Sequence, residues 1–307
     1  MTDSVRWDLD GAVATLTLNR PQARNALTAE LKTDLLGALG QAASSPEVRA
    51  VLITGAGQAF CAGQDLREHA GLLEAARSQA EAPPAAAPPA GAPPAGAPAA
   101  QTPAGTVSAV GPPPDGTTPP GMPAALDTVR EHYNPLVLAI RSMPKPVIAA
   151  VNGVAAGAGA GLAFACDIRI AAQGASFLMA FARVGLAADT GVSWTLPRLA
   201  GAGRAAELLM LAEPIRASRA LELGLVNQVV EDADLAAIAG ALAARLAAGP
   251  TAAYAGIKEQ LNYAAGHGLA DALEKEAEVQ TALGRTADHQ AATLAFTRKQ
   301  EPRFLGR

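Results

Sequence analysis

The N-terminal part of the chain alternates short apolar runs with one helical pattern. Residues 12–18 alternate small or polar with apolar side chains, and residues 49–54 form a second apolar run that stops at a Gly-Ala-Gly turn. Both runs are typical of strands. Leucines recur between them at helical spacing, with Thr28 placed to cap the first turn and Leu27 placed to staple it. The pattern predicts a strand, a helix and a second strand.

The rest of the chain continues this alternation and then becomes helical. Strands are expected at 146–151, 167–171, 176–179 and 226–230, and irregular structure at 182–193. Helices are expected at 126–140, 157–166 and 203–211, and a further helix is capped by Ser218 and ends at Gly224. From Asp232 onward the pattern is all helix, with starts near residues 232, 250, 269 and 287. We therefore expect an α/β core over 1–230 and a helical C-terminal region over 231–307.

Residues 81–123 interrupt the core with a different composition. This segment consists mostly of proline, alanine and glycine and carries only two charges, Glu81 and Asp115. Such a segment has too little apolar surface to offset the entropy of ordering it. We expect a disordered or polyproline-like insertion. A passive role is the commoner outcome for this composition, although an arm that folds over a pocket would restrict the size of a substrate.

Charge and cysteine content narrow the classes of protein further. A formal net charge of −4 without a basic cluster gives no footprint for nucleic acid or for an anionic membrane. The uncharged run 147–166 is long enough to span a membrane, but it is mostly alanine and glycine, so a buried strand, turn and helix explain it better. The N-terminus lacks the apolar core of a signal peptide, and we expect a cytoplasmic protein.

Several chemistries lack their sequence signatures. The four histidines have no ligand spacing, so no metal site is expected, and the serine-hydrolase and P-loop motifs are absent. A glycine spacing at 201–206 fits a dinucleotide fingerprint, but Pro197 and Arg198 stand where the preceding strand should run. Cys61 and Cys166 lie among apolar residues, which favours core positions over nucleophiles.

Two glycine-rich turns remain as candidates for chemistry. They lie at residues 60–66 and 152–159, and the second opens a helix, where unpaired NH groups attract negative charge. Two such turns that converge would offer two NH donors to one oxygen, as in an oxyanion hole. Spacing alone favours the simpler explanation that the glycines permit close packing of helix and strand.

The turns belong to a set of motifs that occurs in one known family. The chain resembles the enoyl-CoA hydratase/isomerase (crotonase) superfamily over nearly its whole length outside the insertion. The motifs that carry the resemblance are Leu18-Asn19-Arg20-Pro21 with Asn25-Ala26-Leu27, the turn Phe60 to Leu66, the block Lys145 to Gly153, Gly185-Leu186 with Leu196-Pro197-Arg198, and the ending Phe304-Leu305-Gly306-Arg307.

The resemblance implies a fold, an assembly and a ligand. The fold would be a crotonase-like α/β spiral of repeated strand-strand-helix units with a helical C-terminal part. The helices of 231–307 would serve oligomerisation, into homotrimers or homohexamers. The ligand would be an acyl-CoA thioester, with coenzyme A as part of the substrate and no separate cofactor. The oxyanion hole would consist of the backbone NH groups of Gln64 and Ala158. Contacts to CoA would come from Arg24, Ala62, Gly63, Gln64, Asp65, Leu66 and Gly157, with Lys258 and Phe304 as looser candidates.

The acid and base positions of hydratases are altered in this sequence. The two catalytic glutamates of that group would fall at Gly161 and Phe181, and neither residue can carry a proton. Asp189 lies in a segment similar to that of the 1,2-epoxyphenylacetyl-CoA isomerases of phenylacetate breakdown, with Ala188 in place of a proline. Asp189 is therefore the candidate base, in a pocket walled by Phe181, Val184, Leu186 and Trp194. Taken alone, Asp189 reads more simply as a turn or helix-cap residue.

The resulting hypothesis is an acyl-CoA isomerase that transfers a proton through a stabilised thioester enolate. Its reaction would be the isomerisation of 1,2-epoxyphenylacetyl-CoA or of 3-enoyl-CoA to 2-enoyl-CoA. Two alternatives stay open at this point. In a 4-chlorobenzoyl-CoA dehalogenase the aspartate would act as a nucleophile, and in a non-catalytic acyl-CoA binding protein the proline-rich arm would recruit partners.

Overall fold

The computed structural model describes residues 4–81 and 128–307. The chain forms two compact units, one of residues Met1–Asp65 with Thr128–Arg307 and one of residues Leu66–Asp127. The described part of the second unit is helix α2 (Leu66–Glu81), which the sequence analysis did not predict. Apart from Glu81, the insertion predicted at 81–123 lies outside the described residues.

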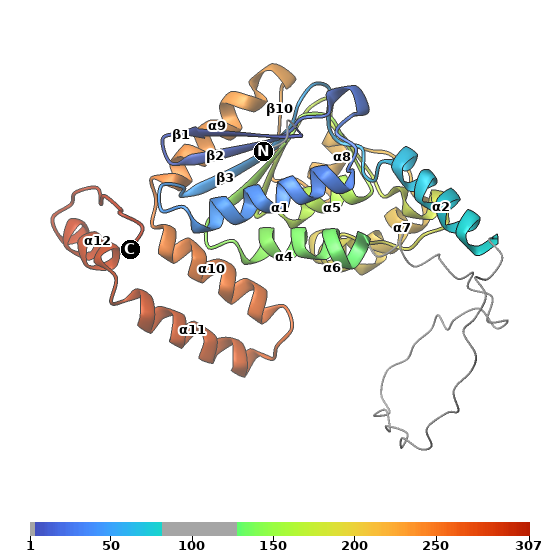
Figure 1. Ribbon diagram of the computed structural model, residues 1–307. Helices are drawn as coiled ribbons and strands as arrows, with labels where there is room; N and C mark the ends of the chain where they lie inside the picture. Colours follow the sequence, from blue (N-terminus) through green and yellow to red (C-terminus); the bar gives the residue numbers. More distant parts are fainter. Residues whose placement is uncertain (1–3, 82–127) are drawn as a thin grey trace, which may run out of the picture. The chain divides into compact units, whose positions relative to one another are not determined.

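Most strands of the first unit form one six-stranded sheet (Figure 1). Its first two strands are an antiparallel pair, and the remaining neighbours are parallel. In sheet order the strands are β1 (Val5–Asp10), β2 (Val13–Leu18), β3 (Ala50–Gly55), β5 (Val147–Val151), β7 (Ile168–Ala172) and β10 (Gln228–Val230). The five strands at 13–18, 50–55, 147–151, 168–172 and 228–230 confirm the sequence prediction, whereas β1 was missed.

A second sheet of four short strands follows the large one in the chain. Its strands, in sheet order, are β4 (Ala59–Cys61), β6 (Val154–Ala156), β8 (Ser176–Leu178) and β9 (Ile215–Arg216). Strands β3, β5 and β7 of the large sheet are each followed directly by a strand of the small one, and β4 and β6 lead into helices. The repeated strand-strand-helix unit expected from the crotonase resemblance is thus confirmed.

Helices cover both sheets and make up the C-terminal part. In chain order the α-helices of the first unit are α1 (Ala29–Ser44), α4 (Asn134–Ser142), α5 (Ala158–Ala165), α6 (Val192–Ala200), α7 (Ala202–Leu211), α8 (Ala217–Glu222), α9 (Leu235–Ala247), α10 (Thr251–Ala264), α11 (Leu269–Leu283) and α12 (Ala287–Thr297). A π-helical segment at Val129–Tyr133 precedes α4. Short 3-10 segments occur at Pro21–Ala23, Ala180–Val184 and Asp232–Asp234. The last four α-helices begin within three residues of the predicted starts.

Helix α1 shows how the sequence pattern becomes structure. The Thr28 hydroxyl accepts a hydrogen bond from the NH of Leu31, as the capping pattern predicts. The leucines at 31, 35 and 39 are buried against the large sheet and α4. In Figure 1, α9 lies above the strands of this sheet and α1 below them. At the other end of α1, Lys145 donates hydrogen bonds to the carbonyl oxygens of Ala42 and Ser45.

The apolar run 147–166 is buried within the molecule. It forms β5, the glycine-rich turn with β6, and α5, in which every residue is buried. The preference for a buried strand, turn and helix is therefore confirmed. Among residues 4–81 and 128–307, no single helix is long and apolar enough to cross a membrane; one bent pair, 232–247 with 251–264, passes by length and composition alone.

One local prediction was wrong. Ser218 does not cap α8, because that helix begins at Ala217 with Arg216 at the cap position and no side-chain cap bond. The segment 182–193 is irregular over 185–191, as expected, but it begins inside a 3-10 turn and ends inside α6. Proline is tolerated in α6 at Pro197, where a dinucleotide fold would need a strand.

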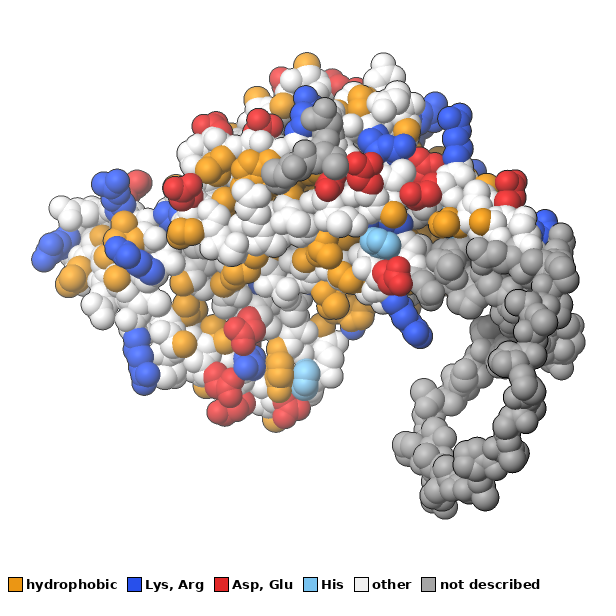
Figure 2. All heavy atoms as spheres, viewed as in Figure 1, with side chains coloured by type: hydrophobic (Ala, Val, Ile, Leu, Met, Phe, Trp, Pro, Cys, Tyr) orange, Lys and Arg blue, Asp and Glu red, His pale blue; other side chains and the backbone are white. Residues whose placement is uncertain are grey.

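The C-terminal tail, residues 298–307, is held by Asp288 of the preceding helix and by Arg49, which lies far away in the sequence. Arg49 donates from Nε to Thr251 Oγ1 at 2.9 Å and from Nη1 to the Phe304 carbonyl at 3.1 Å. Asp288 accepts hydrogen bonds from the NH groups of Leu305 and Gly306. Large apolar side chains on the C-terminal helices stay exposed, and Figure 2 shows hydrophobic side chains on this face over α10 and α11. The tail is thus fixed to the core mainly by polar bonds.

Replacing Arg49 should release the tail before the core unfolds. In Arg49→Ala, amide hydrogen exchange of residues 299–307 should rise strongly, because the side chain that links the tail to α10 is gone. The global unfolding midpoint should fall less than the local protection. Arg6→Ala, at an exposed position of β1, serves as the control. Equal exchange in both variants would contradict the anchoring role.

Candidate active site

The two glycine-rich turns predicted from the sequence meet in the structure. Strands β4 and β6 pair in parallel and bring the turns side by side. A Cβ atom placed on Gly63 would lie 2.7 Å from the Ala156 carbonyl oxygen and 3.6 Å from the Ala158 nitrogen. A Cβ atom on Gly159 would lie 2.2 Å from the Cys61 carbonyl oxygen. Glycine is required at both positions, and close packing and convergence of the turns occur together.

The first turn is held by backbone pairing with residues 24–27. The NH of Ala62 donates to Arg24 O at 3.0 Å, the NH of Leu27 donates to Gly63 O, and the NH of Asp65 donates to Leu27 O. Gln64 is paired with Leu27 in a parallel bridge, in which Leu27 bonds to the residues on either side of Gln64 and not to Gln64 itself. In such a bridge the NH of the middle residue points to the opposite side. The Gln64 NH therefore points away from Leu27.

Two side chains of the N-terminal motif support this turn. Arg20 donates to Asp65 Oδ2 at 2.9 Å and forms an ion pair with it. Asn25 is fully buried, and its amide nitrogen donates to Ala59 O at 2.7 Å and to Ala56 O at 3.0 Å. Arg20 and Asn25 thus help to fix the loop that carries Gln64.

The second turn provides the first NH groups of α5. Gly157 precedes the helix at φ 50°, a region that favours glycine, and its NH donates to Leu178 O at 2.8 Å. Ala158 is the first residue of α5, and the first NH groups of a helix have no partner within the helix. The positive end of the helix dipole lies at the same place. The turn next to Gly63 therefore presents an electropositive backbone.

Asp189 lies in the loop before α6. Burial raises the pKa of its carboxyl group above the usual value, while a hydrogen bond from the Thr190 hydroxyl at 2.6 Å and the charge of Lys32 lower it. The residue at the cap position of α6 is Gly191, and no side-chain cap bond is present there. Asp189 is thus a partly buried carboxylate and not the helix cap that its sequence context alone suggests.

The four residues predicted to wall the pocket of Asp189 differ in exposure. Phe181 is buried, and its ring lies 3.9 Å from a Cβ atom placed on Gly157. Val184 is 55% exposed, Leu186 41% and Trp194 37%. The place of these residues in a wall around Asp189 stays a prediction.

Lys32 and Tyr133 are site residues that the sequence analysis missed. The Lys32 ammonium donates to Gln64 Oε1 at 3.2 Å, and the Tyr133 hydroxyl donates to the same oxygen. A signal was present in the helical pattern, because Lys32 falls on the buried face of α1, one turn before Leu35. A lysine on an apolar face needs a polar partner, but sequence spacing does not say which one.

The two cysteines behave as core residues. Both are fully enclosed, and burial raises the pKa of the Cys61 and Cys166 thiols to about 12. A thiol with such a pKa stays protonated near neutral pH and is a poor nucleophile. The burial of both thiols agrees with the prediction that the two cysteines occupy core positions.

The profile of the enoyl-CoA hydratase/isomerase family matches residues 8–84 and 119–307. The chain belongs to the enoyl-CoA hydratase/isomerase family. It is 38% identical to a probable enoyl-CoA hydratase of Rhodobacter capsulatus, covering 99% of this chain and 98% of that one. It is also 38% identical to a 1,2-epoxyphenylacetyl-CoA isomerase of Escherichia coli, over the whole of both chains. A Mycobacterium abscessus crystal structure, provisionally assigned as an enoyl-CoA hydratase/isomerase, superposes with a TM-score of 0.81 at 40% identity, covering 99% of this chain and 100% of that one.

The two positions at which the resemblance places the hydratase glutamates, 161 and 181, carry residues without a titratable group. A Cβ atom on Gly161 would lie 2.7 Å from Thr190 Cβ and 2.8 Å from Thr190 O. Thr190 is buried at φ 50°, so it cannot easily move aside. The second position is the buried ring of Phe181. The Asp189 loop therefore fills the space that a glutamate side chain at residue 161 would need.

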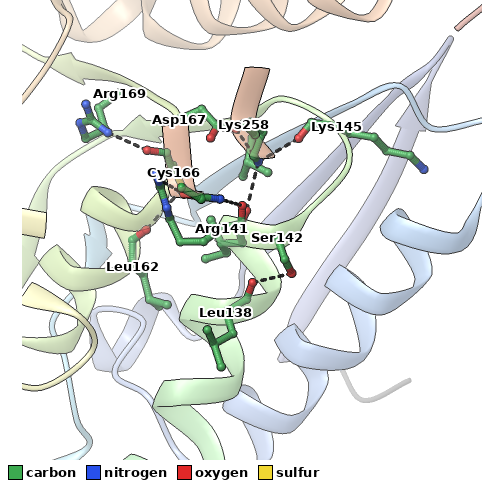
Figure 3. A network of polar contacts seen from close by, with 12 residues as sticks. Leu138, Arg141, Ser142, Lys145, Leu162, Cys166, Asp167, Arg169 and Lys258 are labelled. Atoms are coloured by element: carbon green, nitrogen blue, oxygen red, sulfur yellow. Dashed lines mark hydrogen bonds and ion pairs between the residues drawn. The ribbon is translucent and has the colours of Figure 1, made fainter. Parts of the chain in front are cut away.

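The remaining predicted CoA contacts fall into two groups. Arg24, Gly63, Gln64 and Asp65 lie together with Ala62 and Gly157 around the paired turns, whereas Leu66 begins α2 and is exposed. Lys258 is buried, with its ammonium 2.7 Å from Asp167 and donating to the Ile140 and Lys145 carbonyls (Figure 3). Phe304 lies beside Arg49, at the opposite end of β3 from these turns. The contacts of all these residues with CoA stay predictions.

Gly63→Ala tests the close approach of the turns. The added methyl group would meet Ala156 O at a residue with φ 88°, so the turn must shift and acyl-CoA binding should weaken at least about tenfold. Gly37→Ala is the matched control, because nothing lies within 4 Å of its added Cβ atom on α1, and it should stabilise the fold by about 0.5–1 kcal/mol. Calorimetric titration with a saturated acyl-CoA and thermal unfolding measure both effects. Unchanged binding in Gly63→Ala would show that the turn does not contact the ligand.

Proposed function

We propose that the protein is an acyl-CoA isomerase that moves a proton through a thioester enolate. The observation that carries this proposal is the packing of Thr190 against Gly161, which leaves Asp189 as the titratable side chain among the three candidate acid-base positions 161, 181 and 189. Asp189 acts as the base, and the NH groups of Gln64 and Ala158 bind the thioester oxygen. The enzyme requires no dissociable cofactor, since CoA is part of the substrate.

The reaction follows from the acidity of the thioester. With a 3-enoyl-CoA, the Asp189 carboxylate takes a proton from C2, the electron pair moves into the carbonyl group, and the enolate oxygen is stabilised by the two NH groups. Each such donor contributes about 3 kcal/mol to lowering the barrier, judged by the cost of removing one. Asp189 then returns the proton to C4, which gives the 2-enoyl-CoA. Proton number and charge balance, because the base is regenerated.

The acyl group that we propose is an arylacetyl or enoyl thioester. The similarity to the Escherichia coli 1,2-epoxyphenylacetyl-CoA isomerase supports an epoxide of phenylacetyl-CoA as the natural substrate. In that substrate the same stabilised negative charge promotes opening of the epoxide and expansion of the ring to the oxepin. A place in phenylacetate breakdown follows from this assignment. The similarity to a hydratase is outweighed by Gly161 and Phe181, which cannot activate water.

The decisive variant is Asp189→Asn, which keeps the size of the side chain and removes its basicity. A 3-enoyl-CoA is incubated in heavy water, and mass spectrometry scores double-bond position and deuterium uptake. We expect the variant to lose about 10³-fold in isomerisation rate while it still binds a saturated acyl-CoA. Asp271→Asn, at an exposed position of α11, is the control.

The outcome also separates the alternatives. Isomerisation by Asp189→Asn at the parent rate would contradict the assigned base. Chloride release from 4-chlorobenzoyl-CoA, without any double-bond migration, would replace the isomerase proposal with a dehalogenase. Tight acyl-CoA binding without either reaction would leave a binding protein.

The activity should depend on pH in a direction fixed by Asp189. Burial raises the pKa of its carboxyl group, and the base works only when it is ionised. The rate constant kcat/KM should therefore fall as the pH drops through a pKa that lies above the usual range of an aspartate. A pH profile with a saturating and a limiting 3-enoyl-CoA concentration measures this limb. A limb in the ordinary aspartate range would mean that the carboxylate is hydrated in the working enzyme.

We also propose that the protein is a homotrimer or homohexamer. The C-terminal helices expose large apolar side chains, among them Leu261 at 64%, Leu273 at 54% and Phe296 at 84%. A monomer rarely leaves such side chains clustered in water. Light scattering coupled to gel filtration gives the subunit number, and a monomer at micromolar concentration would rule the assembly out.

A further inference from the structure

Lys32 is a lysine enclosed in the protein near the proposed reaction centre. It lies on α1, and only 2% of the residue is exposed. Its ammonium donates to Gln64 Oε1 at 3.2 Å and to Thr128 Oγ1 at 2.5 Å. It also lies 4.9 Å from the centre of the Tyr133 ring. Burying an ammonium group is costly unless it is paired, so this position calls for a reason.

The contacts of Lys32 converge on the residue that carries a proposed oxyanion donor. The carboxamide oxygen of Gln64 accepts from the Lys32 ammonium and from the Tyr133 hydroxyl. A side chain held by two donors, one of them charged, has little rotational freedom. The backbone of Gln64 is fixed on its other side by the bridge to Leu27. The orientation of the Gln64 NH is therefore set from both sides.

The same cluster reaches the Asp189 loop. Val137 lies one helical turn after Tyr133, and its Cγ1 is 3.1 Å from a Cβ atom placed on Gly191, two residues after Asp189. Among the described residues, the groups that act on the Asp189 carboxylate are the Thr190 hydroxyl from its own loop and Lys32 from α1. The charge of Lys32 opposes the rise in the Asp189 pKa that burial causes.

We propose that Lys32 is an electrostatic positioning residue for the reaction at this site. It fixes Gln64 through the carboxamide and supplies one positive charge close to both Gln64 and Asp189. During the proposed proton transfer, a unit of negative charge leaves Asp189 and appears on the thioester oxygen. A cation near both places stabilises the negative charge before and after the transfer, with no movement of its own. This inference rests on the proposed isomerase function.

Lys32→Met, which keeps the length of the side chain, tests the charge, and Lys32→Arg tests its restoration. Lys145→Met is the matched control, because Lys145 is also a buried lysine and binds carbonyl oxygens at the far end of the same helix. Three quantities are compared. They are kcat and KM for a 3-enoyl-CoA, the acid limb of the kcat/KM profile, and the red shift of a bound cinnamoyl-CoA, whose absorption reports polarisation of the thioester carbonyl.

Lys32→Met should lower kcat about 10- to 100-fold with a smaller change in KM, as for loss of one charge-assisted hydrogen bond at the site. Its acid limb should move to higher pH, because the Asp189 carboxylate loses a neighbouring cation. The red shift of cinnamoyl-CoA should shrink. Lys32→Arg should recover part of all three, and Lys145→Met should lower the unfolding midpoint without moving the acid limb or the red shift.

A structural role alone would give another result. If Lys32→Met and Lys145→Met lose activity and stability in parallel, with an unmoved acid limb and an unchanged red shift, the proposal is overturned. If Lys32→Met fails to fold, Tyr133→Phe removes one of the two donors to Gln64 and should still reduce the red shift; an unchanged red shift there would refute the positioning of Gln64.

The red shift also separates this inference from the proposed function, since it needs binding but no turnover. A parent protein that binds cinnamoyl-CoA with a red shift, reduced in Lys32→Met, supports the positioning role even if no 3-enoyl-CoA is isomerised. In that case the isomerase proposal fails and the role of Lys32 in polarising a thioester stands.

Discussion

The close approach of two backbone segments is the constraint on which the site depends. Strands β4 and β6 are so near that Gly159 has no room for a side chain beside the Cys61 carbonyl, and Gly63 has none beside Ala156. Only this approach brings the start of α5 next to the turn that carries Gln64. The side-chain amide of Asn152, just before β6, donates to Gly57 O at 2.9 Å and to Ala59 O at 3.3 Å and so ties the two segments together. The second sheet, although short, is thus the element that defines the chemistry.

Helix α1 connects the stability of the fold to the site. Lys145 binds the carbonyl groups at its C-terminal end, where a cation also interacts favourably with the helix dipole, and burial lowers the pKa of that lysine. Lys32, in the first turns, reaches the Gln64 side chain. Both are buried cations whose cost is offset by specific oxygen partners. The two lysines fix the helix along its axis, and through it the position of the charge near the site.

The sequence predicted the features that depend on neighbours along the chain. The Thr28 cap, the strands at 13–18 and 50–55 and the starts of the C-terminal helices follow from local patterns, and the structure confirms them. The sequence identified the two glycine-rich turns but did not show that they meet. Their contact depends on the pairing, in a parallel sheet, of segments about a hundred residues apart. Lys32 was missed for the same reason, since its partners come from three separate segments.

The environment of Trp194 is another feature that the sequence could not predict. The sequence placed it in an apolar wall, yet its ring lies between the guanidinium groups of Arg141 and Arg198, at 5.3 and 4.0 Å. The sequence pattern does not distinguish an aromatic residue that lines a pocket from one that contacts a cation. Only the tertiary position of the two arginines decides between them.

The contact between Thr190 and Gly161 has an evolutionary consequence. A side chain at residue 161 and the present path of the 189–191 loop exclude each other, because both need the same volume. Under the proposed function, a lineage that passes from one acid-base arrangement to the other must therefore change both places, and the effects of the two changes are expected to be strongly non-additive.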